Sequence, residues 1–134
     1  MDRSLVPIIA ETHPAGISTR QIKHYIQLHI SGKFRRYDFH KRNWEMYGQR
    51  EPPEYNLLNV NPKAAVNLYY SSNDGLANEK DVLLLDKSLP NSKVFHVDKK
   101  DFSHTDFIFA KNLKELIHKK ILSISNEHEK KNKN

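Results

Sequence analysis

The sequence predicts an α/β fold, because strand-like and helical segments alternate through the second half of the chain. The apolar run 64-AAVNLYY-70 is typical of a short buried strand, and the turn cluster 71-SSNDG-75 follows it. Asn78 is a suitable cap for a helix that extends to about Ser88, and 93-KVFHV-97 is a second strand-like run. The order strand, helix, strand, helix is characteristic of a parallel sheet that is covered by helices.

Two further helical segments are expected after the second strand. Phe107 and Ile108 begin a short segment, and Asn112 begins the final helix. Apolar residues then recur at helical spacing, at Leu113, Leu116, Ile117, Ile121 and Ile124. The sequence beyond Ile124, SNEHEKKNKN, has no apolar residue. Because such a segment cannot offset its ordering entropy by burial, residues 125–134 are expected to form a disordered basic tail.

The first half of the chain contains one clear helix signal. The segment 18-STRQ-21 has the pattern of a capping box, and Gly32 is a natural helix end. One face of this helix is expected to carry Ile22, Tyr25, Ile26, His29 and Ile30. Residues 33–58 mix aromatic and charged side chains with 52-PP-53, which predicts an irregular, loop-rich covering layer rather than an independent core.

The composition excludes several classes of protein. The net charge is +6, but the basic residues are scattered through different elements, so a nucleic-acid binder is not favoured. There is no cysteine, hence no disulfide scaffold and no thiol nucleophile. No apolar run is long enough to span a membrane, and none at the N-terminus is typical of a signal peptide. The chain would therefore be cytoplasmic if Met1 is the true start.

Asp74 and His104 are the candidate functional residues. Each follows one of the two expected strands, at the end of a parallel sheet where active sites are built. An acid after one strand and a histidine after the next is also the order of these groups in an α/β-hydrolase triad. The simpler alternatives are a turn aspartate and a histidine that caps the helix after it. The other seven histidines lack the paired spacing of zinc-binding helices, so no metal site is expected.

A more specific resemblance lies in the residues around this pair. The chain resembles the end of the acid lipase family, which comprises gastric and lysosomal lipases and their insect relatives, over about residues 5–122. The motifs that carry the resemblance are 13-HPAGIST-19, 31-SGKFRRYDF-39, 52-PPEYNL-57, 73-NDGLANEKDVLLL-85, 89-LPN-91 and 104-HTDFIFA-110.

The resemblance implies a C-terminal fragment of an α/β-hydrolase. Residues 1–58 would be the end of the cap, and residues 59–124 the last two parallel strands and flanking helices of the core. Asp74 would be the triad acid and His104 the general base, with no metal and no cofactor. The implied activity is hydrolysis of lipid esters, triglycerides or sterol esters, by a secreted or lysosomal enzyme.

The chain departs from the family at the nucleophile, because it contains no G-x-S-x-G. The glycine two residues before Ser18 is present, but Arg20 stands where the second is required. The triad serine is thus absent, and the chain alone is predicted to be inactive, with a complementary N-terminal fragment as a possible partner. The alternatives that remain open are a catalytically inactive remnant that binds lipid or a partner, and a basic nucleic-acid binder with salt-dependent affinity.

Overall fold

The computed structural model describes residues 2–13, 15–60 and 65–132. The chain divides into two compact units, unit 1 from Met1–Glu11 with Val60–Asn134 and unit 2 from Thr12–Asn59. The division near residue 59 is close to the expected boundary at 58, but the first residues group with the C-terminal part. The Asp2 amide donates to the Phe109 carbonyl at 2.6 Å, and the Asp2 carboxylate lies 3.5 Å from the Lys111 ammonium. Such long-range contacts leave no local signal in the sequence.

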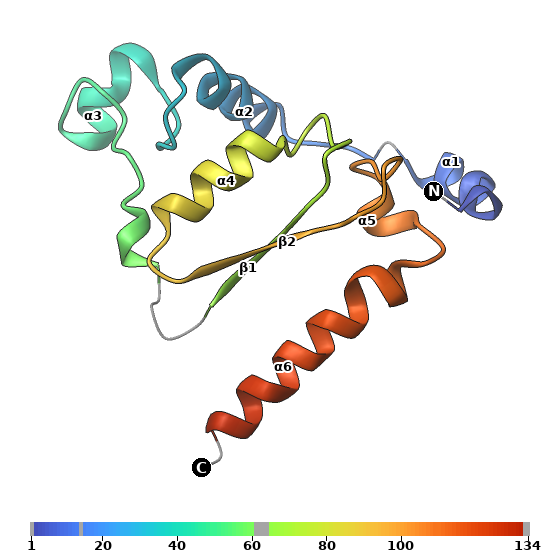
Figure 1. Ribbon diagram of the computed structural model, residues 1–134. Coiled ribbons are helices and arrows are strands. Elements are labelled where there is room, and N and C mark those ends of the chain that lie inside the picture. Colours follow the sequence, from blue (N-terminus) through green and yellow to red (C-terminus); the bar gives the residue numbers. More distant parts are fainter. Residues whose placement is uncertain (1, 14, 61–64, 133–134) are drawn as a thin grey trace. The chain divides into compact units, whose positions relative to one another are not determined.

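Unit 1 contains the predicted parallel strand pair. Strand β1 (Val66–Tyr70) lies beside β2 (Ser92–His96) in a parallel register, with Val66 opposite Ser92 and Tyr70 opposite His96 (Figure 1). Helix α4 (Glu79–Ser88) connects the two strands and contacts both. The predicted α/β order is confirmed for these elements; Ala64, the first residue of the expected strand, lies outside the described residues.

Asn78 caps α4 as predicted, since its side chain accepts a hydrogen bond from the Lys80 amide at 2.9 Å.

The core of unit 1 lies beyond the carboxyl ends of the strands. Phe102 is fully buried and packs with Val97, Leu113 and Ile117. Its ring meets that of Phe107 edge-on, with centroids 4.8 Å apart. The core therefore fixes the loop between β2 and helix α5 (Asp106–Phe109), the loop that carries His104.

The last helix is longer than the sequence predicts. A π-helical turn at Lys114–His118 leads into α6 (Lys119–Asn132). Residues 125–131, expected to be a disordered tail, are helical and exposed. They bury nothing, so their helicity rests on local terms, such as the helix propensity of Glu and Lys and the hydrogen bond from the Ser123 hydroxyl to Glu127 at 3.1 Å.

Helix α1 (Val6–Thr12) precedes unit 2, whose main helix is α2 (Thr19–Ser31). Gly32 ends α2 in the left-handed conformation with φ +63°, as predicted. The predicted capping box is wrong, because the Ser18 side chain makes no capping hydrogen bond. The Ser18 carbonyl instead accepts from the Gln21 and Ile22 amides.

The rest of unit 2 is the irregular, aromatic-rich layer that the sequence predicts. Its regular elements are short: 3₁₀ turns at His40–Arg42 and Leu57–Asn59, and helix α3 (Asn43–Tyr47). One antiparallel bridge joins Arg35 to Glu54.

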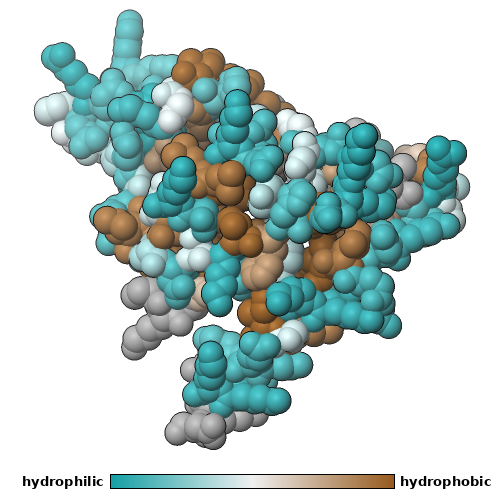
Figure 2. Space-filling model, in the orientation of Figure 1, coloured by the Kyte–Doolittle hydropathy of each residue, from teal (hydrophilic) through white to brown (hydrophobic). Residues whose placement is uncertain are grey.

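In the described part of the chain, no helix combines the length and the apolar character that crossing a bilayer requires. Figure 2 shows hydrophobic surface exposed between hydrophilic side chains.

The outer edge of β1 is unpaired within the described residues, because the sheet contains only β1 and β2. Two side-chain atoms of β1, Asn67 Oδ1 and the Tyr69 hydroxyl, are buried and have no hydrogen-bond partner among the described residues. Burial also raises the pKa of the Tyr69 hydroxyl. An open strand edge presents unpaired backbone groups, which favours pairing with another chain.

We therefore expect the isolated chain to associate as its concentration rises, and to be poorly soluble. Light scattering coupled to size-exclusion chromatography over a concentration series measures this directly. A soluble monomer that unfolds cooperatively at high concentration would contradict the expectation.

Replacing Phe102 by alanine removes the only large apolar side chain among the described residues that is fully buried. We expect Phe102→Ala to lower the free energy of unfolding by about 3–5 kcal/mol, because it leaves a cavity in a small core. Urea unfolding followed by far-ultraviolet circular dichroism, at low protein concentration, checks this. Ile108→Ala is the matched control, since Ile108 is 70% exposed and its truncation is expected to cost under about 0.5 kcal/mol. Equal effects of the two changes would refute this account of the core.

Candidate active site

The loops after β1 and β2 meet and are joined by a buried hydrogen bond. Ser71, which directly follows β1, is 1% exposed, and its hydroxyl donates to the Phe102 carbonyl at 2.7 Å. The Val97 amide donates to the Tyr70 carbonyl at 2.8 Å and extends the strand ladder into both loops. These bonds fix the two chain segments on which Asp74 and His104 lie.

Asp74 and His104 are in direct contact, as the acid and base of a triad would be. His104 Nδ1 lies 3.0 Å from Asp74 Oδ2. The Asp74 side chain is 2% exposed, whereas the His104 ring is 53% exposed. The carboxylate is thus held inside the protein, and the ring presents its other edge to the surface.

The second carboxylate oxygen of Asp74 is fixed by the backbone. Oδ1 accepts hydrogen bonds from the Leu76 amide at 2.8 Å and the Ala77 amide at 2.9 Å. Burial alone would raise the pKa of Asp74, but the hydrogen bonds from Ala77, His104 and Leu76 outweigh it and lower that pKa. Asp74 is therefore ionised at neutral pH, oriented both by the turn and by the histidine.

This ionisation determines which ring nitrogen of His104 carries the proton. An ionised carboxylate only accepts hydrogen bonds, so Nδ1 must be the donor to Asp74. In the neutral ring, Nε2 then has a free lone pair. Within the described residues Nε2 makes no hydrogen bond, and a lone pair at the surface is what a general base requires.

The residues around His104 form a second anchor that the sequence analysis did not identify. Asp106 is 3% exposed, and its Oδ2 accepts from both the Ser103 amide (2.9 Å) and the Ser103 hydroxyl (2.8 Å). Burial acts to raise the pKa of Asp106, but hydrogen bonds, those from Ser103 among them, lower it to about 2. The signal was available, since a serine three residues before an aspartate at a helix start is a local turn pattern.

The simpler alternatives for the two residues do not describe this geometry. Thr105, not His104, is the N-cap residue of α5, and no side-chain cap is formed there. Asp74 does bond its own turn, but it uses one oxygen for the turn and the other for His104. The turn and the histidine contact are therefore two parts of one arrangement.

No serine in the described residues is bonded to His104. The three serines in these loops are engaged elsewhere: Ser71 with Phe102, Ser103 with Asp106, and Ser72 with His96 Nε2 at 3.0 Å. Among the residues described, no group of three His, Asp or Glu side chains could hold a metal ion. The site thus consists of a buried, oriented carboxylate and an imidazole ring whose other edge is exposed.

The lowered pKa of Asp74 predicts a specific pH dependence of stability. The contribution of this carboxylate is fully present above its unfolded-state pKa of about 3.9 and is lost as the pH falls through the lower folded-state pKa. We expect the free energy of unfolding of the native chain to exceed that of Asp74→Asn at about pH 5 and above. Below about pH 4 the difference should shrink. Urea titrations at a series of pH values measure it, and a difference that grows as the pH falls below about 4 would contradict the assignment.

Comparison with known proteins places the chain among lipases. It is 34% identical to Lipase 1 of Drosophila melanogaster over 92% of its length, and 36% identical to Lipase 3 of the same organism over 96%. It is 33% identical to human gastric triacylglycerol lipase over 95% of its length. No family model matches the chain. The chain spans only 28–33% of the length of these three relatives. The chain therefore belongs to the lipase family that includes the gastric and insect enzymes, and corresponds to a C-terminal portion of its members.

Proposed function

We propose that the chain supplies the acid and the general base of a serine lipase. The observation that carries this proposal is the contact between His104 Nδ1 and the buried carboxylate of Asp74, which leaves the opposite edge of the ring exposed. The nucleophilic serine and the oxyanion hole would come from the part of the lipase that this chain does not contain. The substrates would be lipid esters, as the name of the gastric triacylglycerol lipase suggests.

The chemistry follows from the orientation of the ring. His104 Nε2 would take the proton from the serine hydroxyl as the serine oxygen attacks the ester carbonyl. The imidazolium formed would be stabilised by the ionised Asp74 and would return the proton to the leaving alcohol. Water would then attack the acyl-enzyme, with His104 as base again, and release a fatty acid and the free serine. This mechanism needs neither a metal nor an organic cofactor.

The proposal extends to the full-length lipase of which this chain would be a part. The family resemblance implies sterol esters as a second substrate class. It also implies a secreted or lysosomal location. The partner would be the N-terminal portion of a lipase, whether it is covalently continuous or a separate fragment. The open edge of β1 supports this, since another strand there would bond to its unpaired backbone groups.

A second candidate function is a catalytically inactive remnant that binds lipid or a partner. The observation that favours it is the apolar face of α2, where Ile22, Tyr25, Ile26 and Ile30 are 43–78% exposed. Binding of a fatty acyl ligand without turnover, even when a lipase N-terminal portion is supplied, would favour this candidate over the first.

A chimera tests the first candidate. The matching segment of Drosophila Lipase 1 is replaced by this chain, and hydrolysis of a short-chain ester is measured. We expect turnover, with kcat reduced about 10³-fold or more by His104→Ala, because no other group would take the serine proton.

His96→Ala is the matched control, because His96 is an exposed histidine at the end of β2 whose ring meets Ser72 and Tyr70 and makes no contact with Asp74 or His104 among the described residues. Retained activity in the His104→Ala chimera, or equal losses in the two variants, would overturn the proposal. The isolated chain is expected to show no turnover, and ester hydrolysis by it that disappears with His104→Ala would also count against the proposal.

A further inference from the structure

Unit 2 contains an open pocket that the proposed chemistry does not use. It has a volume of about 590 Å³ and is lined by His40, Lys41, Trp44 and Arg50. No acidic residue lines it, and none of its residues belongs to the Asp74–His104 site. Lys41 and Arg50 are cationic at neutral pH. The imidazole of His40 adds a positive charge when it is protonated.

The cations of the pocket are available to a ligand. Neither the Lys41 ammonium nor the Arg50 guanidinium forms an ion pair within the described residues. Two neighbouring arginines, in contrast, are held in ion pairs: Arg35 with Glu51 at 2.7 Å and Arg42 with Glu45 at 3.0 Å.

The carboxylate nearest to His40 is Asp38, with Oδ1 3.7 Å from His40 Nδ1. That oxygen accepts hydrogen bonds from the His40 amide and the Asn43 side chain. Asp38 does not line the pocket, so Lys41 and Arg50 give the lining itself an excess of positive charge.

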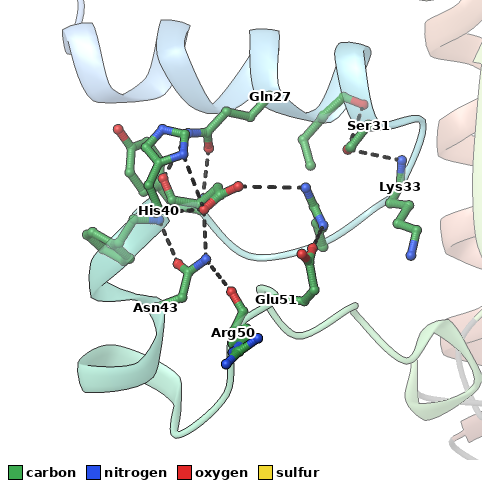
Figure 3. A network of polar contacts seen from close by, with 12 residues as sticks. Gln27, Ser31, Lys33, His40, Asn43, Arg50 and Glu51 are labelled. Carbon is green, nitrogen blue, oxygen red and sulfur yellow. Dashed lines mark hydrogen bonds and ion pairs between the residues drawn. The ribbon is translucent and has the colours of Figure 1, made fainter.

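A buried asparagine holds the walls of the pocket in place. Asn43 is only 3% exposed. Its Oδ1 accepts a hydrogen bond from the Phe39 amide at 2.8 Å. Its Nδ2 donates to Asp38 Oδ1 at 2.8 Å and to the Arg50 carbonyl at 2.7 Å (Figure 3). These bonds connect the two ends of the loop that forms the pocket. His40 has φ +56°, a left-handed conformation that costs a non-glycine residue free energy and persists only where its surroundings fix it. The pocket is thus preformed.

Trp44 indicates the kind of anion that the pocket would meet. Its side chain is 67% exposed in the pocket that the cations also line, and Met46 on the same short helix is 45% exposed. A tryptophan beside lysine and arginine is typical of surfaces that rest at a membrane–water interface. There the ring lies at headgroup depth and the cations meet lipid phosphates or carboxylates.

We propose that the pocket formed by His40, Lys41, Trp44 and Arg50 docks the protein on an anionic lipid surface. Lys41 and Arg50 bind the acidic headgroups, and Trp44 enters the interfacial layer. The choice of lipid over other polyanions rests on the proposed lipase function. Docking itself needs no turnover, so the pocket and the Asp74–His104 chemistry can fail independently.

The single tryptophan of the chain makes the test direct, since Trp44 is both the proposed contact and the only tryptophan fluorophore. The 134-residue chain is mixed with phosphatidylcholine vesicles that contain or lack 30% phosphatidylglycerol, and vesicle flotation separates bound protein from aggregates. We expect flotation and a blue shift of Trp44 emission with the anionic vesicles only, both weakened by added salt. Equal binding to the neutral vesicles would overturn the proposal.

The double variant Lys41→Gln/Arg50→Gln tests the site. It should weaken binding to anionic vesicles at least about tenfold, since each cation contributes to attraction at the surface. Lys80→Gln/Lys87→Gln removes the same charge from α4, far from the pocket in sequence, and should retain most of the binding. Equal weakening in both variants would show attraction by net charge and refute the site. A Trp44 emission shift with a single-stranded oligonucleotide but not with anionic vesicles would also refute it, in favour of a nucleic-acid surface.

Discussion

The hydrogen bond from the Ser71 hydroxyl to the Phe102 carbonyl is the contact on which the candidate active site depends. It joins residues 31 positions apart, and both partners are buried. Asp74 lies three residues after one end of this bond, and His104 two residues after the other. The parallel pairing of β1 and β2 brings the two loops to the same end of the sheet, and this bond fixes their separation. The contact between carboxylate and imidazole is then a consequence of the backbone geometry.

The sequence predicted the parts of the molecule that are determined locally. The strand–helix–strand order follows from apolar runs, a turn cluster and the Asn78 cap, and the two candidate residues follow from their place after each strand. The Ser71–Phe102 bond could not be predicted in the same way, because its partners lie 31 residues apart. The Ser103–Asp106 anchor has a local turn pattern, but its burial leaves no signal in the sequence. Serine and aspartate are common turn residues, and only the three-dimensional arrangement shows which of them are buried. The helix over residues 125–131 was missed because it has no apolar pattern.

The two units differ in which side chains they bury and which they expose. Unit 1 buries the groups that must stay fixed, Asp74, Ser71, Phe102 and Asp106, and leaves the His104 ring half exposed. Unit 2 buries Asn43 and exposes the cations and Trp44 around it. In both units a buried polar residue orients an exposed one. In unit 1 the exposed group is suited to proton transfer, and in unit 2 to binding an anion.

The proposed role of His104 in proton transfer depends most on Asp74 imposing one tautomer on its ring. Measuring the ¹⁵N chemical shifts of the two ring nitrogens, at a pH where the imidazole is neutral, tests this directly. The account predicts a protonated Nδ1, an unprotonated Nε2, and a mixture of tautomers in Asp74→Asn. A neutral ring that carries its proton on Nε2 would contradict it, because such a ring could neither donate to Asp74 nor take a proton from a serine.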